Sequence, residues 1–172
     1  MTDKLLQSLR DKYKNGEKIR ILFVCLGNIC RSPAAQGIMQ SVIDAHGDTD
    51  RFFLDSAGLY GGHAGDLPDK RMRVHAIRRG YSLTHRSRKI HECDFDDFDL
   101  VIGMDDANID GLRRLAPTLE DEAKIVRMTD FLRRLPYYDS VPDPYYEGAE
   151  GFEHVLDLLE DATESLFDQI AR

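Results

Sequence analysis

Four short runs of apolar residues recur along the chain, at residues 19–25, 52–57, 100–104 and 125–128. Their shortness, their β-branched residues and the Gly, Asp and polar residues that mostly bound them predict four β-strands. Nearly continuous apolar runs are typical of strands that are buried on both faces of a parallel sheet. We therefore expect helices to cover both faces of this sheet.

Apolar residues between and after these runs recur at helical spacing, which predicts helices that alternate with the strands. Three such groups are Ala35, Ile38, Met39 and Val42, ended by Gly47; Met72, Val74, Ala76 and Ile77, ended by Gly80; and Ile109, Leu112 and Leu115, before Pro117. The clearest group forms the C-terminal segment, with Phe152, Val155, Leu156, Leu159, Ala162, Leu166 and Ile170. The pattern predicts one α/β domain, a four-stranded parallel sheet with helices on both faces.

The first 18 residues precede the first predicted strand. Leu5, Leu6, Leu9 and Tyr13 lie at helical spacing within residues 3–14, which predicts a helix that packs against the body of the protein. No internal repeat and no long linker divides the remainder. We therefore expect an N-terminal extension, residues 1–18, followed by one domain at residues 19–172.

Charge is unevenly distributed over the 172 residues, whose formal net charge is −8. Residues 135–171 contain ten acidic residues and no lysine or arginine, whereas residues 70–89 contain eight basic residues and no acid. The acidic total argues against nucleic acid or an anionic membrane as a partner. The basic run is either a solvated face or a local attractor for an anionic substrate.

Three cysteines, Cys25, Cys30 and Cys93, are too few for a disulfide scaffold and indicate a reducing compartment. The N-terminal sequence shows no secretory signal pattern and no stretch approaches the apolar length of a membrane span, so we expect a cytoplasmic protein. We expect neither a metal nor another cofactor, because metal-ligand spacing is missing among His46, His63, His75, His91 and His154.

The loop after the first predicted strand carries the most informative residues: Cys25-Leu26-Gly27-Asn28-Ile29-Cys30-Arg31-Ser32-Pro33. Ser32 is a favourable N-cap and Pro33 a favourable first helical residue, so we expect the next helix to begin there. A helix N-terminus offers unpaired N–H groups and a positive dipole end to an anion. The loop therefore resembles a binding site for a phosphate-like oxyanion.

Three residues of this loop are suited to a site for such an anion. Gly27 allows a close approach of the backbone, and Arg31 supplies a bidentate positive charge. Near Arg31 and a helix N-terminus, Cys25 is expected to be a thiolate at neutral pH, which is the nucleophilic form. The alternative is an inert, buried cysteine at a strand end.

At this point the chain strongly resembles the low-molecular-weight protein tyrosine phosphatases. The resemblance rests on the loop and on three further motifs, Asp55-Ser56-Ala57-Gly58, Ser82-x-x-His85-x-x-Arg88 and Asp143-Pro144-Tyr145-Tyr146. It implies metal-independent hydrolysis of protein phosphotyrosine and of aryl phosphates. Cys25 would attack phosphorus to form a phosphocysteine, Arg31 would stabilise the transferring group, and Asp143 would act as general acid and then general base.

The resemblance also implies the remaining site residues. Phosphate, free or on a tyrosine-phosphorylated protein, would be bound by Leu26, Gly27, Asn28, Ile29, Cys30 and Ser32, with Tyr145 and Tyr146 as an aromatic wall. Ser32 would stabilise the thiolate, while Asn28, Ser56 and His85 would support the loop through hydrogen bonds. Asp105, after the third strand, would bond to the loop backbone rather than react.

Departures from the family pattern bear on the substrate. A smaller threonine replaces Ile29 in the branch that acts on phosphoarginine, so isoleucine favours phosphotyrosine. Gly62 stands where many members have an aromatic residue, and Tyr60 or His63 could substitute for it. A related arsenate reductase needs two further cysteines, but only Cys93 lies outside the loop. A binding module without turnover would need neither the thiolate nor the acid.

Overall fold

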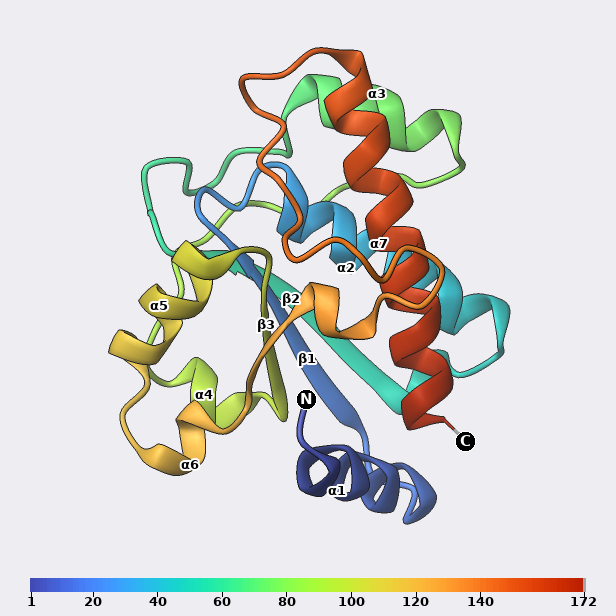
Figure 1. Cartoon of the computed structure of the whole chain (residues 1–172), viewed down its shortest axis with the longest axis vertical. Helices are drawn as coiled ribbons and strands as arrows, with labels where there is room; N and C mark the ends of the chain where they lie inside the picture. Colours follow the sequence, from blue (N-terminus) through green and yellow to red (C-terminus); the bar gives the residue numbers. More distant parts are fainter. Residues whose placement is uncertain (172) are drawn as a thin grey trace.

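A four-stranded, fully parallel sheet in the order β2-β1-β3-β4 forms the centre of the computed structural model, which describes residues 1–171 (Figure 1). The strands are β1 (Ile19–Cys25), β2 (Phe52–Gly58), β3 (Leu100–Gly103) and β4 (Ile125–Arg127). The predicted fold class is confirmed, and each strand ends within one residue of its apolar run. Residue 172 of the expected domain lies outside the described residues.

Helices connect and cover these strands. They are α1 (Asp3–Lys14), α2 (Arg31–Ala45), α3 (Lys70–Arg78), α4 (Asp94–Asp97), α5 (Asp106–Leu115), α6 (Leu119–Glu122) and α7 (Ala149–Ile170), with 3-10 turns η1 (Thr49–Arg51) and η2 (Met128–Phe131). The sequence did not predict α4, α6 or the two 3-10 turns, because so few residues show no helical periodicity. Within residues 1–171, no helix has both the length and the apolar content needed to cross a membrane.

The sheet has a hydrophobic core on each face, which explains the continuous apolar runs. Ile21 and Phe23 of β1 belong to the larger core with residues of α2 and α7. The alternate residues Leu22 and Val24 belong to the smaller core with Phe95, Phe98 and Leu112 from α4, α5 and the chain between them. Because successive side chains of a strand point to opposite faces, both sets must be apolar.

The strand order places β1 at the switch point of the sheet. The chain leaves β1 toward β2 on one side, and β3 lies on the other side of β1. Loops that follow parallel strands meet at one edge of the sheet, and ligands bind beside such a switch point. Helix α1 lies at the opposite edge, where β1 begins (Figure 1), so it is remote from the loop after β1.

Several acidic side chains of α7 form ion pairs with arginines from other parts of the chain. Arg79 of α3 contacts Glu153, Asp157 and Glu160 of α7. Arg134, after η2, contacts Glu164. These partners are far apart in the sequence, so the composition did not reveal them. The basic run is also partly neutralised, because its residues Arg71, Arg79 and Arg88 all pair with carboxylates.

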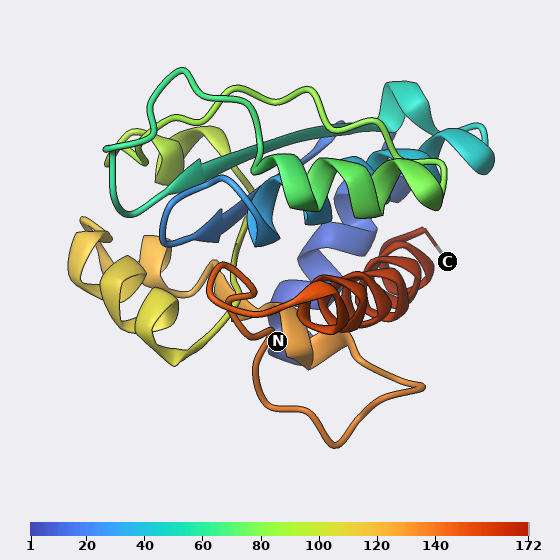
Figure 2. The same ribbon diagram turned by 90° about the horizontal axis from the view of Figure 1, so that it is seen from above.

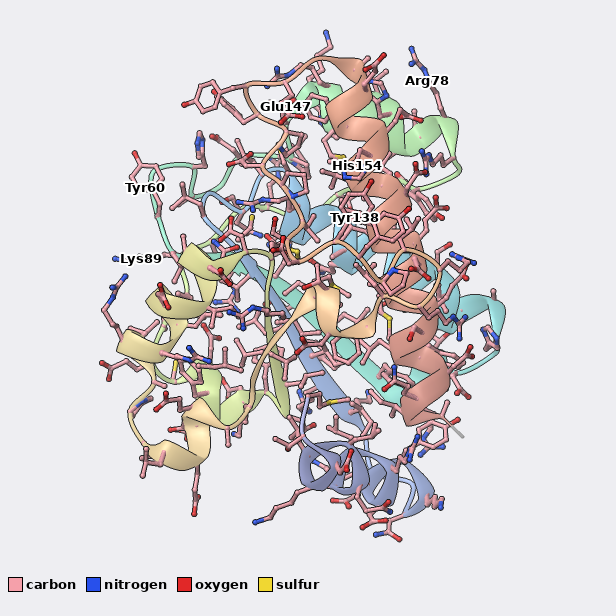
Figure 3. All side chains as sticks on the ribbon, viewed as in Figure 1. Tyr60, Arg78, Lys89, Tyr138, Glu147 and His154 are labelled. Carbon is pink, nitrogen blue, oxygen red and sulfur yellow. The ribbon has the colours of Figure 1, made fainter. Side chains whose placement is uncertain are left out.

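Residues 132–148 connect η2 to α7 without forming a helix or strand. This 132–148 segment extends outward beside α7 and then returns to the edge of the sheet (Figure 2). Tyr138 of the segment packs against His154 of α7, with 4.8 Å between their ring centroids (Figure 3). The segment thus depends on α7 for part of its position.

Candidate active site

The loop between β1 and α2 has a left-handed turn at Asn28, whose φ is 56°. A residue other than glycine rarely adopts this conformation, so its side chain must stabilise it. Asn28 is buried, and its Nδ2 donates to the hydroxyls of Ser32 at 2.7 Å and Ser56 at 3.0 Å. Its Oδ1 accepts from the backbone N–H of Arg88 at 3.1 Å and from His85 Nε2 at 3.0 Å. The expected support residues therefore meet at one buried amide.

The predicted start of the following helix is wrong by two residues. Helix α2 begins at Arg31, with Cys30 in the N-cap position and without a side-chain cap. Ser32 does not cap the helix, because its hydroxyl lies 3.0 Å from the Sγ of Cys25 and accepts from Asn28 instead. The strand, the loop and the helix are consequently joined through one hydroxyl beside the sulfur.

A second layer of contacts holds the support residues themselves. Ser56 Oγ donates to Gln36 Oε1 at 2.7 Å, and His85 Nδ1 lies 3.5 Å from the carboxylate of Asp55. Burial lowers the pKa of His85, against the opposing effect of Asp55. Because Asn28 Oδ1 can only accept, His85 Nε2 carries the proton that it donates to Asn28.

Arg31 is the fixed positive charge of the site. Its side chain is buried, and its guanidinium donates to Asp105 at 2.6 Å and to the carbonyl of Val141 at 3.0 Å. Burial opposes the charged form, but Cys25, Asp105 and Asp143 outweigh this and raise the pKa of Arg31. The guanidinium stays charged although it is almost inaccessible to water.

The contacts of Asp105 differ from the expected bonds to the loop backbone. This carboxylate binds the guanidinium of Arg31 rather than the loop backbone. Its other oxygen accepts from the backbone N–H of Asn108 at 2.8 Å and so caps α5. Asp105 therefore orients Arg31 from the start of the neighbouring helix, which the sequence could not reveal because 74 positions separate the two residues.

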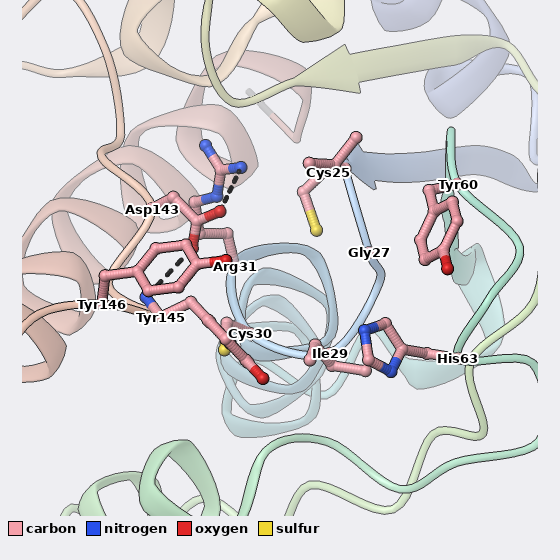
Figure 4. A pocket seen from close by; sticks show the side chains of 11 residues that line it. Cys25, Gly27, Ile29, Cys30, Arg31, Tyr60, His63, Asp143, Tyr145 and Tyr146 are labelled. Atoms are coloured by element: carbon pink, nitrogen blue, oxygen red, sulfur yellow. Dashed lines mark hydrogen bonds and ion pairs between the residues drawn. The ribbon is translucent and has the colours of Figure 1, made fainter.

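A pocket of about 240 Å³ opens above this loop. Figure 4 shows the Cys25 sulfur facing into it, with Asp143, Tyr145 and Tyr146 on one side and Tyr60 and His63 on the other. The residues that line it are Cys25, Leu26, Gly27, Ile29, Cys30, Arg31, Tyr60, His63, Asp143, Tyr145 and Tyr146. Ser32, Ser56, His85 and Asp105 lie behind the lining and hold it in place.

Asp143 reaches the pocket from the 132–148 segment. One carboxylate oxygen lies 3.6 Å from the guanidinium of Arg31, and the other accepts from the backbone N–H of Tyr145 at 3.1 Å (Figure 4). The side chain is 41% exposed, so a proton can pass between it and solvent or a bound ligand. The adjacent Pro142 and Pro144 restrict the backbone on either side.

The second wall of the pocket depends on Gly62. A Cβ atom at this position would lie only 2.0 Å from the Tyr60 hydroxyl, so the Tyr60 ring occupies the space that a side chain at residue 62 would need. The backbone N–H of Tyr60 donates to the carbonyl of Leu26 at 2.8 Å, which ties this wall to the loop. The Tyr60 ring thus lies beside position 62, and His63 packs edge-on against it.

Several residues that hold this arrangement were not predicted from the sequence. Gln36 follows Ser32 by one helical turn, so helical spacing could have indicated it. Ser87 donates to the carbonyl of Gly27 at 3.1 Å, and Asp69 donates its backbone N–H to the carbonyl of Ile29 at 2.7 Å. No sequence signal marks these two contacts, which arise only in the folded chain.

Burial distinguishes the two cysteines of the loop from the third. Cys25 and Cys30 are buried, whereas Cys93 is exposed and does not line the pocket. Burial is the main cause that raises the pKa of Cys30, so this thiol stays neutral. In the described part of the chain, no group of three or more His, Cys, Asp or Glu side chains is arranged to hold a metal ion.

Comparison with known proteins finds relatives that match most of this chain. Proteins named low molecular weight protein-tyrosine-phosphatase from Bacillus subtilis and Streptomyces coelicolor are 39% identical over 155 residues and 38% identical over 148 residues. The alignments cover 90% and 86% of this chain, and 97% and 90% of those proteins. The crystal structure of a protein tyrosine phosphatase from Entamoeba histolytica, with Hepes in its active site, is 43% identical. It has a TM-score of 0.85 and covers 88% of this chain and 96% of its own.

A family profile matches most of the chain as well. The profile described as low molecular weight phosphotyrosine protein phosphatase matches residues 20–172, which include every residue of the loop, the pocket and its supports. Only the extension with α1 and the first residue of β1 lie outside this match. The chain belongs to the low molecular weight phosphotyrosine protein phosphatase family.

Proposed function

We propose that this protein hydrolyses phosphotyrosine in proteins, and simple aryl phosphates, through a phosphocysteine intermediate on Cys25. The observation that carries the proposal is the arrangement around the Cys25 sulfur. It faces the pocket at the N-terminus of α2, 3.0 Å from the Ser32 hydroxyl. Buried Arg31 and the carboxylate of Asp143 line the same pocket.

In the first step, the dianionic phosphate binds to the N–H groups of the loop and to Arg31. The Cys25 thiolate attacks phosphorus in line, so that an S–P bond forms while the P–O bond to the tyrosine ring breaks. Asp143 donates its proton to the departing phenolate oxygen. The Ser32 hydroxyl donates to the sulfur before the attack, and Arg31 stabilises the equatorial oxygens during it.

In the second step, water attacks the phosphorus of the phosphocysteine and the S–P bond breaks. The Asp143 carboxylate, deprotonated by the first step, takes a proton from this water. Inorganic phosphate leaves and the thiolate is restored. Arg31 serves both steps, because it holds the phosphate in each. It also donates to the carbonyl of Val141, two residues before Asp143, and so links the phosphate site to the chain that carries the acid.

The walls of the pocket favour a phenyl ring as the group that carries the phosphate. Tyr60 on one side and Tyr145 on the other are both partly exposed, with 57% and 38% of their surfaces accessible. An aromatic substrate gains from such contacts, whereas phosphoserine is too short to reach between the rings. Ile29 lines the same pocket. The branch of the family that acts on phosphoarginine resembles this chain but has a smaller residue at this position.

Peptides with one phosphorylated residue test the proposed substrate class. In excess EDTA, we expect a phosphotyrosine peptide to be hydrolysed at least about tenfold more efficiently than phosphoserine and phosphoarginine peptides of matched sequence, because only the phenyl ring meets both walls. Phosphate release gives kcat/KM for each peptide. Faster hydrolysis of phosphoarginine, reduction of arsenate, or loss of activity in EDTA would each replace the proposed reaction with another.

The wall formed by Tyr60 gives a more specific prediction. Gly62→Ala introduces the Cβ that would collide with the Tyr60 hydroxyl, so the ring must leave its place. We expect KM for a phosphotyrosine peptide to rise about fivefold at nearly constant kcat, since one aromatic contact contributes about 1 kcal/mol. Tyr60→Ala should have the same effect, and the double variant should show no further loss.

The neighbouring Gly61→Ala is the matched control, because its Cβ would meet only the flexible side chain of Lys89 at 3.3 Å. Its KM should stay near that of the wild type. Additive losses in the double variant, or an equal loss with Gly61→Ala, would show that the Tyr60 ring does not form the wall.

A further inference from the structure

A buried carboxylate on α7 binds the beginning of the 132–148 segment. Asp161 is 1% exposed and accepts hydrogen bonds from three consecutive backbone N–H groups. These belong to Arg133 at 3.1 Å, Arg134 at 3.0 Å and Leu135 at 3.0 Å. Charge-assisted bonds of this kind are stronger than neutral ones, and the buried carboxylate has little access to water as an alternative partner.

The side chains of the same residues make a weaker attachment. Arg134 also contacts Glu164 at 2.9 Å, and both of these side chains are largely exposed. Exposed pairs contribute little, because solvent screens them. The carboxylate of Asp161 is therefore the principal polar attachment at the beginning of the segment.

A second attachment lies near the other end of the segment, beside Asp143. The backbone N–H of Val141 donates to the carbonyl of Met104 at 2.8 Å, and the carbonyl of Val141 accepts from Arg31 at 3.0 Å. Between this attachment and Leu135, the chain has neither a helix nor a strand. The path of the segment is thus defined at two places, and Asp161 supplies the first.

We propose that Asp161 is a positioning residue that sets the place of Asp143 for proton transfer. This inference rests on the proposed role of Asp143 as the general acid. Loss of the Asp161 carboxylate leaves three consecutive N–H groups without their acceptor, so the beginning of the segment is no longer held to α7 by these bonds. A small displacement of a catalytic group from its reactive geometry lowers the rate steeply. Cys25 and Arg31 lie on β1 and α2 and keep their places.

Leaving groups of different acidity separate positioning from general damage. Phenolate leaves poorly and needs a proton from Asp143, whereas dinitrophenolate leaves readily without one. For Asp161→Ala, we expect kcat/KM for phenyl phosphate to fall about tenfold and kcat/KM for dinitrophenyl phosphate to fall less than about twofold. A loss of stability alone reduces the active fraction and so lowers both constants by the same factor.

Two other variants complete the experiment. Asp161→Asn keeps one acceptor oxygen and the side-chain shape, so we expect the same selective loss at about threefold, and this variant decides the question if Asp161→Ala does not fold. Asp157→Asn is the matched control, because Asp157 lies one turn earlier on α7 and contacts Arg79 of α3 instead of the segment. It should leave both rates unchanged.

The outcomes distinguish this inference from the proposed function. If Asp143→Asn shows the selective loss on phenyl phosphate but neither Asp161 variant does, Asp161 has no positioning role and the proposed acid stands. Equal losses on both substrates in the Asp161 variants also overturn the positioning role. If Asp143→Asn itself shows no selective loss, Asp143 is not the acid and both proposals fail.

Discussion

Cys25→Ser is expected to abolish hydrolysis of aryl phosphates and phosphotyrosine peptides, with a loss in kcat/KM of about 10⁴-fold or more. A serine hydroxyl remains protonated at neutral pH and is a far weaker nucleophile than a thiolate. Among the described residues, no histidine makes a hydrogen bond to the Cys25 sulfur and could activate a hydroxyl there, since the partner of that sulfur is the Ser32 hydroxyl. The variant therefore loses the nucleophile but keeps the anion site.

Two measurements should accompany the rate. The Cys25→Ser variant should still bind inorganic phosphate competitively with a phosphotyrosine peptide, since Arg31 and the loop N–H groups remain. It should also unfold near the wild-type temperature, because serine fits the space of cysteine. Cys93→Ser is the matched control, because Cys93 is exposed and does not line the pocket. Residual activity in Cys25→Ser within tenfold of the wild type would exclude a phosphocysteine mechanism.

The sequence predicted the sheet well, because strands that are buried on both faces form nearly continuous runs of apolar residues. Residues 21–24 of β1 are buried and apolar on both faces, and the run at residues 19–25 coincides with the strand. It also predicted that Cys25 and Arg31 lie close together, because only a short loop separates them, and both line the same pocket. The strand pattern and the spacing of these two residues depend only on neighbouring positions, so they can be predicted from the sequence.

Features that depend on distant residues were predicted poorly. The pairing of Asp105 with Arg31 and the contacts of Asp161 were not predicted, because only the folded chain brings these partners together. The N-cap at Ser32 was wrong because the hydroxyl has a competing partner, the sulfur of Cys25 at the end of β1. In each case a tertiary contact overrode a local preference that was reasonable for the isolated segment.

The left-handed residue of the loop illustrates the same limit. Nothing in the sequence Gly27-Asn28-Ile29 favours a positive φ at Asn28 over Gly27, since glycine adopts that conformation more easily. The structure places the turn at Asn28 because its amide there reaches Ser32, Ser56 and His85 together. The resemblance to a family supplied these residues, whereas the physical reason became visible only in the fold.

Asp143→Asn is expected to lower kcat/KM for phenyl phosphate by about 10²- to 10³-fold, the usual contribution of a general acid. The amide keeps the shape of the carboxyl group and can still accept from the backbone N–H of Tyr145, so the segment should hold its position. It has no proton to give to a departing phenolate. With dinitrophenyl phosphate, which needs no such proton, kcat/KM should remain near the wild-type value.

The second role of Asp143 predicts a different effect on kcat. Without a carboxylate to take a proton from water, the phosphocysteine should accumulate, so dinitrophenyl phosphate should give a burst of one phenolate per enzyme followed by slow turnover. Rapid-quench kinetics and the mass of the phosphorylated protein measure this burst. Asp139→Asn is the control, because Asp139 is an exposed acid on the same segment that does not line the pocket. Slow turnover without a burst would restrict Asp143 to the first step and would require another base for the second.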